Sequence, residues 1–248
     1  MKIILSPAKK MKKDDDLEFY DLPVFLDNTK EILRCLKGLS KNDLKDIWKC
    51  NDKILDENIN RLEKMNLEGD LTPAILAYDG IAYKYMAPSV FEDNQFSYIQ
   101  EHLRILSAFY GILRPMDGVR PYRLEMQAKL RVNSSKDLYA YWGDELYKSI
   151  VDESHVIINL ASKEYSKCIE KYLNEDDRYI TITFCESVNG KLVTKGTYAK
   201  MARGEMVRYM AENNISDVEG IKSFNRLGYV YRDDLSSDDE YVFERVYK

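Results

Sequence analysis

Short apolar, β-branched runs and amphipathic helical segments are interspersed along the chain, and this pattern constrains the fold more than any other feature. Strand-like runs are predicted at 2–5, 155–160, 179–186, 191–195, 228–232 and 241–246. Helical segments are predicted at 29–36, 42–48, 53–65, 98–113, 137–151, 162–173 and 197–213. Because strands and helices do not alternate strictly, the sequence predicts a mixed α/β (α+β) protein. We expect a central mixed sheet surrounded by helices, with a helical hairpin as an insert.

Two local signals add detail to this pattern. Asn189-Gly190 lies between two strand-like runs and predicts a tight β-hairpin, because both residues tolerate positive φ. Thr72-Pro73 predicts a helix start, with Thr72 as the cap and Pro73 as the first helical residue.

The chain has 248 residues, of which 45% are hydrophobic and 32% are charged. This length and composition predict one globular domain over 1–248, with a helical sub-domain at about 28–68. The sequence holds no apolar run long enough for a membrane span and no signal-peptide pattern. A monomeric cytoplasmic protein without membrane contact is the expectation.

Cysteine and histidine are too sparse for most metal and redox sites. Four cysteines occur without a CxxC pair, and there are only two histidines. The loops GxxxxGK[ST], GxGxxG and GxSxG are absent. We therefore expect no cofactor and no metal site, although these patterns leave a purely carboxylate metal site open.

The segment 111–126, GILRPMDGVRPYRLEM, concentrates arginine in a chain of net charge −5. Pro115 and Pro121 prevent a continuous helix, because each lacks an N–H and restricts the residue before it. The segment therefore predicts a shaped loop, called here the arginine loop, which presents Arg114, Arg120 and Arg123.

The helical segment 197–213 carries a second basic cluster. Helical periodicity places one apolar side on Ala199, Ala202, Met206, Tyr209 and Met210. The opposite side carries Lys200, Arg203 and Arg208, and Lys195 comes just before the helix. This stripe suits a phosphate backbone, and it equally suits an ordinary solvated helix face.

A third basic cluster surrounds the segment 36–47, LKGLSKNDLKDI. A first helix is predicted to end at Gly38, and Ser40 with Asp43 forms a capping box for a second helix. The segment resembles the helix-hairpin-helix motif of DNA-repair proteins at Leu36, Gly38, Leu39 and Ile47, and departs from it at Ser40 and Leu44. A plain helical hairpin remains the alternative. The surrounding cations are Arg34, Lys37, Lys41, Lys45 and Lys49.

Five sequence blocks together resemble the YaaA family of bacterial peroxide-stress proteins. They are Ser6-Pro7-Ala8-Lys9, Tyr78-Asp79-Gly80, Leu113-Arg114-Pro115 with Pro121-Tyr122-Arg123-Leu124-Glu125-Met126, Asn159-Leu160-Ala161-Ser162 with Glu164-Tyr165, and Lys200 to Tyr209 with Ala202-Arg203-Gly204. The likeness covers nearly all of 1–246. Met201 stands where the family usually has a second arginine.

The resemblance implies a fold particular to that family and a cytoplasmic protein that limits iron-dependent damage under peroxide. It also implies binding of double-stranded or distorted DNA through a basic cleft and the helix-hairpin-helix-like element. The residues expected to meet phosphate are Lys9, Lys10, Lys37, Lys41, Lys45, Arg114, Arg120, Arg123, Lys195, Lys200, Arg203 and Arg208.

Two other functions compete with DNA binding. An enzyme acting on a phosphorylated nucleoside or on DNA would use Glu125 or Asp79 in the same cleft, with Asp117 as a further acid–base candidate. Glu125 could instead be a structural partner of Arg123 or Arg120. Direct sequestration of ferrous iron is disfavoured, because carboxylate sites hold that ion loosely.

Overall fold

A computed structural model describes residues 1–14 and 16–246, and in that part of the chain the central sheet has eight strands. The strands are β1 (Lys2–Leu5), β3 (Leu103–Ser107), β4 (Gly111–Leu113), β6 (Val156–Asn159), β7 (Arg178–Val188), β8 (Lys191–Val193), β9 (Tyr229–Tyr231) and β10 (Glu240–Arg245). Their order is β4-β3-β1-β6-β7-β10-β9, and β8 pairs with β7. The predicted mixed α/β class is confirmed.

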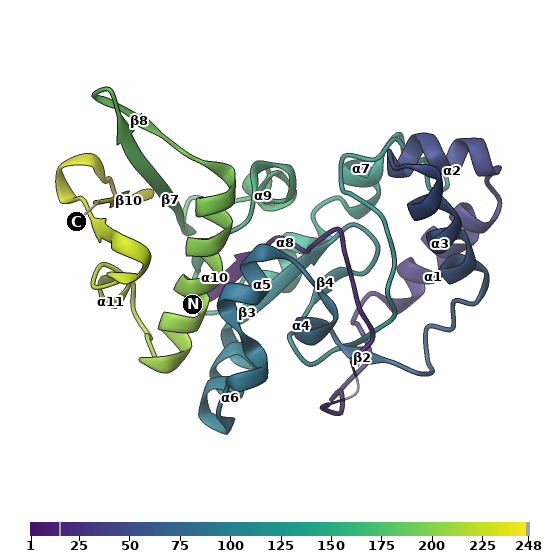
Figure 1. The fold of residues 1–248 in the computed structure, drawn as a ribbon, viewed down its shortest axis with the longest axis horizontal. Coiled ribbons are helices and arrows are strands. Elements are labelled where there is room, and N and C mark those ends of the chain that lie inside the picture. The colour runs from purple at the N-terminus through teal and green to yellow at the C-terminus, as the bar shows by residue number, and fades with distance from the viewer. Residues whose placement is uncertain (15, 247–248) are drawn as a thin grey trace.

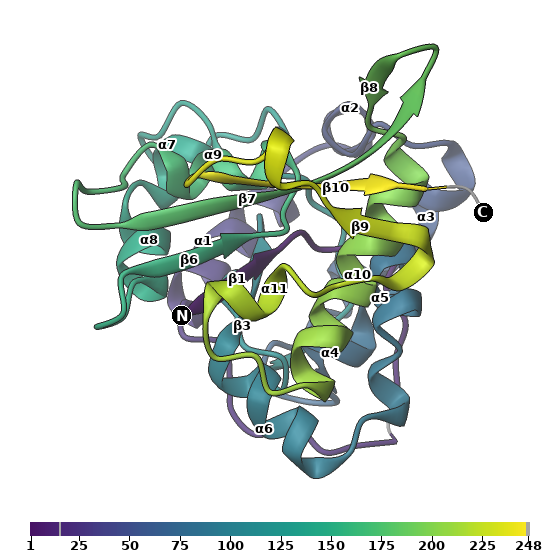
Figure 2. The same ribbon diagram turned by 90° about the vertical axis from the view of Figure 1, so that its left-hand side faces the viewer.

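The middle of the sheet is parallel and its edges are antiparallel. β3, β1, β6, β7 and β10 run parallel to their neighbours, whereas β4, β8 and β9 are antiparallel. Figure 2 shows β1, β6 and β7 side by side. Three of the four β1 residues are buried, as a strand covered on both faces requires.

The connections place a topological switch point beside β1. The chain leaves β1 and returns in β3 on one side of it, and later enters β6 on the other side. The loops that follow β1 and β6 therefore diverge at the carboxyl ends of two adjacent parallel strands. Such a divergence leaves a crevice at the edge of an open sheet.

Three helices gather at one end of the molecule, at the right of Figure 1: α1 (Leu26–Lys37), α2 (Lys41–Trp48) and α3 (Asp52–Glu63). Their inward side chains, including Ile32, Trp48 and Leu55, join the hydrophobic cluster of the sheet. The α1–α2 turn has the predicted form, because Gly38 follows α1 and the Ser40–Asp43 capping box is present.

The other helices surround the sheet. They are α4 (Ala74–Ala77), α5 (Ile81–Met86), α6 (Asp93–His102), α7 (Leu138–Trp142), α8 (Glu145–Ile150), α9 (Lys163–Glu170), α10 (Gly196–Glu212) and α11 (Val218–Ile221). Short 3₁₀ turns occur at Pro88–Val90, Arg226–Gly228 and Asp233–Leu235. α6 packs on β1 and β3, and α10 packs on β7 and on α5.

The contact between α5 and α10 depends on Gly204. A Cβ atom at this position would lie 1.9 Å from the carbonyl oxygen of Ala82 in α5. Only a residue without a side chain allows the two backbones to approach so closely. This approach places α10 beside the loop that begins α5.

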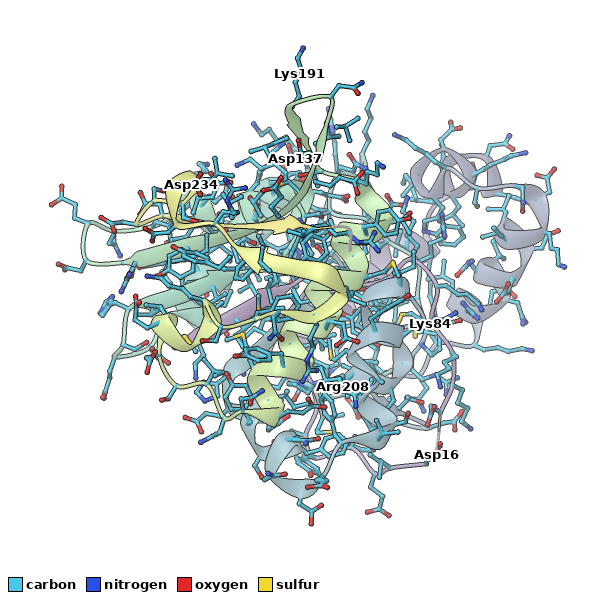
Figure 3. All side chains as sticks on the ribbon, turned by 60° about the vertical axis from the view of Figure 1, so that its left-hand side comes forward. Asp16, Lys84, Asp137, Lys191, Arg208 and Asp234 are labelled. Atoms are coloured by element: carbon cyan, nitrogen blue, oxygen red, sulfur yellow. The ribbon has the colours of Figure 1, made fainter. Side chains whose placement is uncertain are left out.

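The β7–β8 hairpin has the predicted turn. Asn189 and Gly190 have φ values of 52° and 76°, and Val188 pairs with Lys191 across the turn. The hairpin extends away from the rest of the molecule in Figures 1 and 2, and Figure 3 shows Lys191 at its tip.

The prediction of one helix over 98–113 is wrong beyond residue 102. α6 ends at His102, and the chain continues directly into β3 and then β4. Four of the five residues of β3 are buried, because this strand lies between β1 and β4 inside the sheet. A short apolar run of this kind has the same residue pattern in a buried helix and in a buried strand.

Two other helix predictions need correction. The single helix predicted over 137–151 is two helices, α7 and α8, because Gly143 between them has φ 51° and ψ −135°. Thr72 and Pro73 do not begin a helix. They form the two-residue strand β2, which pairs with β5 (Gly118–Val119), and the Thr72 hydroxyl donates to the carbonyl of Asp14.

Candidate functional site

A cavity of about 470 Å³ lies at the carboxyl ends of β1 and β6, where the switch point predicts a crevice. We call it the β1–β6 cavity. Its wall comes from five parts of the chain: 5–10 after β1, 79–83 at the start of α5, 122–125 in the arginine loop, 160–165 after β6, and 200–203 in α10. Its volume is in the range of small-molecule sites, about 300–1,000 Å³.

The two loops that leave β1 and β6 are fastened to each other. The backbone N–H of Ser162 donates to Ser6 Oγ at 2.8 Å, and that hydroxyl donates to Ser162 Oγ at 3.1 Å. A Cβ atom on Gly80 would lie 2.6 Å from Ala8 Cβ, so the α5 loop also packs closely against the β1 loop. The floor of the cavity is therefore held in one arrangement.

Glu125 lies in the wall between two cations. Lys9 Nζ is 2.8 Å from Glu125 Oε1, and Arg123 Nη2 is 3.9 Å from the same oxygen. Arg123 also donates twice to the carbonyl of Trp48, which ends α2, at 3.2 Å. Arg123 thus joins the cavity to the three-helix end of the molecule.

Asp79 holds a second pair of cations at the rim. Lys10 Nζ lies 2.5 Å from Asp79 Oδ2, and Lys84 Nζ lies 3.3 Å from Oδ1. The hydrogen bond from Lys10 holds the pKa of the Asp79 carboxyl below its usual value. Asp79 is therefore a paired carboxylate near neutral pH.

Arg203 is a cation of the wall with one buried donor that is not satisfied. Its Nε is buried and has no hydrogen-bond partner, and no ion pair to Arg203 occurs within residues 1–14 and 16–246. Burial lowers the pKa of its guanidinium group. A partly buried cation with an unsatisfied donor is costly, and an oxyanion in the cavity would reduce that cost.

Lys200 lies one turn before Arg203 on the same side of α10. It is exposed, it lines the cavity, and it makes no ion pair within the described part of the chain. The two cations therefore offer an anion one partly buried guanidinium group and one flexible ammonium group.

Glu164 is a third carboxylate of the wall, after Glu125 and Asp79, and it lies in the first turn of α9. Its Oε1 accepts the backbone N–H of Gln127 at 3.2 Å. Burial raises the pKa of this carboxyl, and the nearby charge of Glu125 raises it further. Glu164 belongs to one of the five sequence blocks, but its role was not predicted from the sequence. The signal that could have identified Glu164 is its position in the first turn of a helix that follows a strand of the parallel sheet.

Tyrosines make the rigid side of the cavity. The Tyr122 hydroxyl is 2.7 Å from Ser107 Oγ and 3.0 Å from the Tyr78 hydroxyl, and the Tyr83 hydroxyl donates to the carbonyl of Ser6 at 3.0 Å. Tyr165 adds a further buried ring to the wall. Aromatic faces with occupied hydroxyls suit a flat, uncharged part of a ligand.

Comparison with known proteins gives the family. The sequence profile described as "Peroxide stress protein YaaA" matches residues 1–235. The chain belongs to the YaaA family of peroxide stress proteins. It is 68% identical over 246 residues to a UPF0246 protein of Agathobacter rectalis, covering 99% of both chains. It is 54% identical to UPF0246 proteins of Lachnoclostridium phytofermentans and Desulfitobacterium hafniense, covering 98% and 99% of this chain and 96% and 98% of theirs.

Each of the five sequence blocks that resemble the YaaA family contributes to the wall of the β1–β6 cavity. The structure brings together Lys9, Lys10, Arg123, Lys200 and Arg203 among the predicted phosphate contacts, and Glu125 and Asp79 among the predicted acids. Segments separated by most of the chain length therefore meet at one place.

The other two arginines of the arginine loop are directed elsewhere. Arg114 Nε lies 3.1 Å from Asp117 and its Nη2 lies 2.9 Å from Asp21. Arg120 Nη1 lies 2.5 Å from Asp70. Neither arginine lines the β1–β6 cavity, so the expectation that all three loop arginines share a cleft holds for Arg123 alone. Asp117 likewise lies outside it.

The basic stripe predicted on α10, which suited either a phosphate backbone or an ordinary solvated face, is divided. Arg203 enters the cavity wall rather than the solvated face, because α5 covers α10 at Gly204. Arg208 Nε is 2.7 Å from Glu212, and Figure 3 shows Arg208 far from the β7–β8 hairpin. Lys195, at the other end of the helix, pairs with Glu186.

The lysines of the α1–α2 hairpin lie outside the cavity, and two of them face carboxylates of α3. Lys41 Nζ is 2.6 Å from Asp56, and Lys45 Nζ is 2.6 Å from Asp52. Lys37 is exposed at the end of α1. A role of this hairpin in DNA binding stays a prediction.

Two further observations concern the described residues as a whole. No group of three or more His, Cys, Asp or Glu side chains in them is arranged to hold a metal ion. None of their helices combines the length and the apolar character needed to cross a membrane.

Proposed function

We propose that this YaaA-family protein binds DNA during peroxide stress, with a phosphate group held in the β1–β6 cavity by Arg203 and Lys200. The observation that carries the proposal is the buried Nε of Arg203, which lacks a partner among the described residues. Lys9, Lys10 and Arg123 would extend the contact along the strand at the rim.

Phosphate fits the donors of this wall better than other anions. A guanidinium group presents parallel N–H donors that match two phosphate oxygens, and such charge-assisted bonds are the strongest that side chains form. Several cations around one opening also suit a polyanion, whose successive phosphates can meet them in turn.

The test compares two arginine variants. Arg203→Met should weaken binding of a duplex oligonucleotide by about ten- to hundredfold, the worth of a hydrogen bond to a charged group. The matched control is Arg226→Met, because Arg226 is already paired with Glu205 and Glu212 outside the cavity. Fluorescence anisotropy over a range of salt concentrations gives both the affinity and the salt slope.

The unfolding free energy of the same two variants gives an independent measurement. Arg203→Met should leave it unchanged or raise it, because an uncompensated buried charge is removed. Arg226→Met should lower it, because Glu205 loses its ion pair and Glu212 keeps only the one with Arg208. Equal DNA affinity of wild type and Arg203→Met would refute the proposal.

A second candidate function is an enzyme that acts on a phosphorylated nucleoside in the same cavity. The observation that favours it is the presence of Glu125 and Glu164 in one wall of nucleotide-sized volume. Tight binding of a mononucleotide, with little gain from longer strands, would favour this candidate. Affinity that rises with strand length and falls steeply with salt would favour DNA binding.

The effect on iron-dependent damage would then be indirect. We infer that bound protein shields DNA from radicals formed by ferrous iron and peroxide. Strand breakage by these reagents should decrease when wild-type protein is added, and should decrease less with Arg203→Met. Equal protection by both proteins would separate the protective effect from the cavity.

A further inference from the structure

Two carboxylates of the β1–β6 cavity have opposite surroundings. Glu125 is close to cations, with Lys9 at 2.8 Å and Arg123 at 3.9 Å. Glu164 accepts a backbone N–H from Gln127 and makes no ion pair within the described residues. Glu125 is thus paired with cations, whereas Glu164 is partly buried without an ion pair, and burial raises its pKa.

This combination has a specific chemical use. Hydrolysis of a glycosidic bond needs one carboxylic acid to protonate the leaving group and one carboxylate to stabilise the positively charged sugar. Environments that separate the pKa values of two carboxyl groups assign these roles.

We propose that the β1–β6 cavity hydrolyses the N-glycosidic bond of a phosphorylated nucleoside unit. Glu164 is the general acid, and Glu125 is the carboxylate that faces the sugar. The unit is either a free nucleotide or a nucleotide turned out of a DNA strand, because both present the same phosphate, sugar and base. The inference rests on the proposed phosphate contact with Arg203.

The arrangement of the wall gives the ligand an orientation. Arg203 and Lys200 on α10 take the phosphate, and the base lies toward the part of the wall that contains Tyr83, Tyr122 and Tyr165. The sugar then lies between them, near the two carboxyl groups. A base held against aromatic rings is how enzymes read a nucleotide taken out of its stack.

The step balances with water as the co-reactant. The C1′–N bond breaks, its electron pair goes to the base nitrogen, and the base receives the proton of Glu164. The oxygen of water bonds to C1′, and Glu125 accepts the proton that this water loses. Return of that proton to Glu164 through solvent restores the enzyme. The products are the free base and the sugar phosphate.

The experiment measures release of free base by chromatography. Substrates are deoxyadenosine monophosphate, its 7-methyldeoxyguanosine counterpart, and short single-stranded oligonucleotides that carry each base. A 7-methylguanine leaving group is already cationic and needs no proton from an acid. Wild-type protein should release base from a free nucleotide, from an oligonucleotide or from both, and the substrate that reacts identifies the source.

Three variants separate the roles. Glu164→Gln should lower release of adenine by roughly two to four decades, the usual worth of a general acid, and should lower release of 7-methylguanine much less. Glu125→Gln should lower both, since both reactions pass through a charged sugar. Glu101→Gln is the control, because Glu101 is exposed at the end of α6 and outside the cavity. Circular dichroism checks that each variant folds.

The pH profile is a second readout. The rate should fall as the pH rises through the raised pKa of Glu164, and Glu164→Gln should lose this alkaline limb. The charged and titratable groups that face Glu164 are Glu125, Lys9, Tyr139, Tyr165 and Cys168, together with the backbone N–H groups of Met126 and Gln127.

Two outcomes would overturn the inference. The first is the absence of base release by wild-type protein from every substrate. The second is an equal decrease in the release of adenine and of 7-methylguanine by Glu164→Gln, which would mean that this residue is not the acid. In either case the DNA affinity of Arg203→Met still decides the proposed function, because that measurement needs no turnover.

Discussion

The β1–β6 cavity and the α1–α2 hairpin have similar numbers of cations, and they differ in what those cations meet. On the hairpin, Lys41 and Lys45 lie 2.6 Å from Asp56 and Asp52 of α3, on an exposed surface. In the cavity, Arg203 has a buried Nε without an acceptor among the described residues. The cavity also has paired cations, since Lys9 and Lys10 contact Glu125 and Asp79, so what sets it apart is a buried donor without a partner.

The two regions also differ in the strength of their charge interactions. Exposed ion pairs such as those of the hairpin are worth about 0–1 kcal/mol and weaken further in salt. An unpaired buried guanidinium group interacts with an anion in a poorly solvated place, where the attraction is several times stronger. The two regions should therefore respond very differently to substitution.

The largest effect is expected for Gly204→Ala, which tests the cavity side of the comparison. The added Cβ would lie 1.9 Å from the Ala82 carbonyl oxygen, so α10 must move away from α5. We expect the unfolding free energy to fall by about 1–3 kcal/mol or more, as for other overpacked contacts. DNA affinity should fall with it, because Lys200 and Arg203 move with the helix.

The control for this variant is Gly196→Ala, at the first residue of α10. A Cβ atom there meets nothing within 4 Å. Denaturant unfolding and anisotropy on both variants separate a general effect of alanine in α10 from the loss of the close contact. Equal stability of the two variants would show that α5 and α10 can separate without cost.

A smaller effect is expected for Lys37→Glu combined with Lys41→Glu, which tests the hairpin side. DNA affinity should fall by roughly threefold at low salt and hardly at all at high salt, because exposed charges act through a screened field. The unfolding free energy should change by no more than about 0.5 kcal/mol. A loss as large as that of Arg203→Met would place the principal DNA contact on the hairpin instead.

The smallest effect is expected from Asp117, which pairs with Arg114 in the arginine loop. Burial raises the pKa of Asp117 to about 6, against the opposing effect of Arg114. Its folded-state pKa is thus above the unfolded value, so the folded state holds the extra proton between about pH 4 and 6. The contribution of Asp117 to stability should fall as the pH rises through this window.

The measurement is the difference in unfolding free energy between wild type and Asp117→Asn, followed from pH 4 to 7. The difference isolates Asp117 from the other carboxyl groups. A difference that stays constant with pH would contradict the raised pKa. A difference that falls as the pH rises would show that Asp117, the partner of Arg114, is only partly charged in mildly acidic solution.

The sequence predicted the fold where the local pattern has only one structural solution. Asn189-Gly190 requires positive φ at both residues, and Ser40 with Asp43 satisfies the start of α2 within four residues. The residues of β3 could not be assigned in this way. Their burial comes from β1 and β4, and a run of apolar residues does not reveal its neighbours.

The residues of the candidate site were predictable in part, and their pairings were not. The five sequence blocks do meet at one cavity, which family resemblance indicated. Asp70 and Asp21, which pair with Arg120 and Arg114, are distant in sequence, so the local pattern did not show that these two arginines face away. Likewise, no helical periodicity shows that Arg203 would be buried beside Gly204.

The dispersed origin of the cavity wall has a consequence for how the protein is made. The ribosome synthesises the loop after β1 early, and it adds Lys200 and Arg203 only when most of the chain has been made. The Ser6–Ser162 contact that fastens the floor joins residues separated by 156 positions. A nascent chain therefore has no complete anion site until α10 has emerged and packed, so an unfinished protein lacks the whole set of groups proposed to hold DNA.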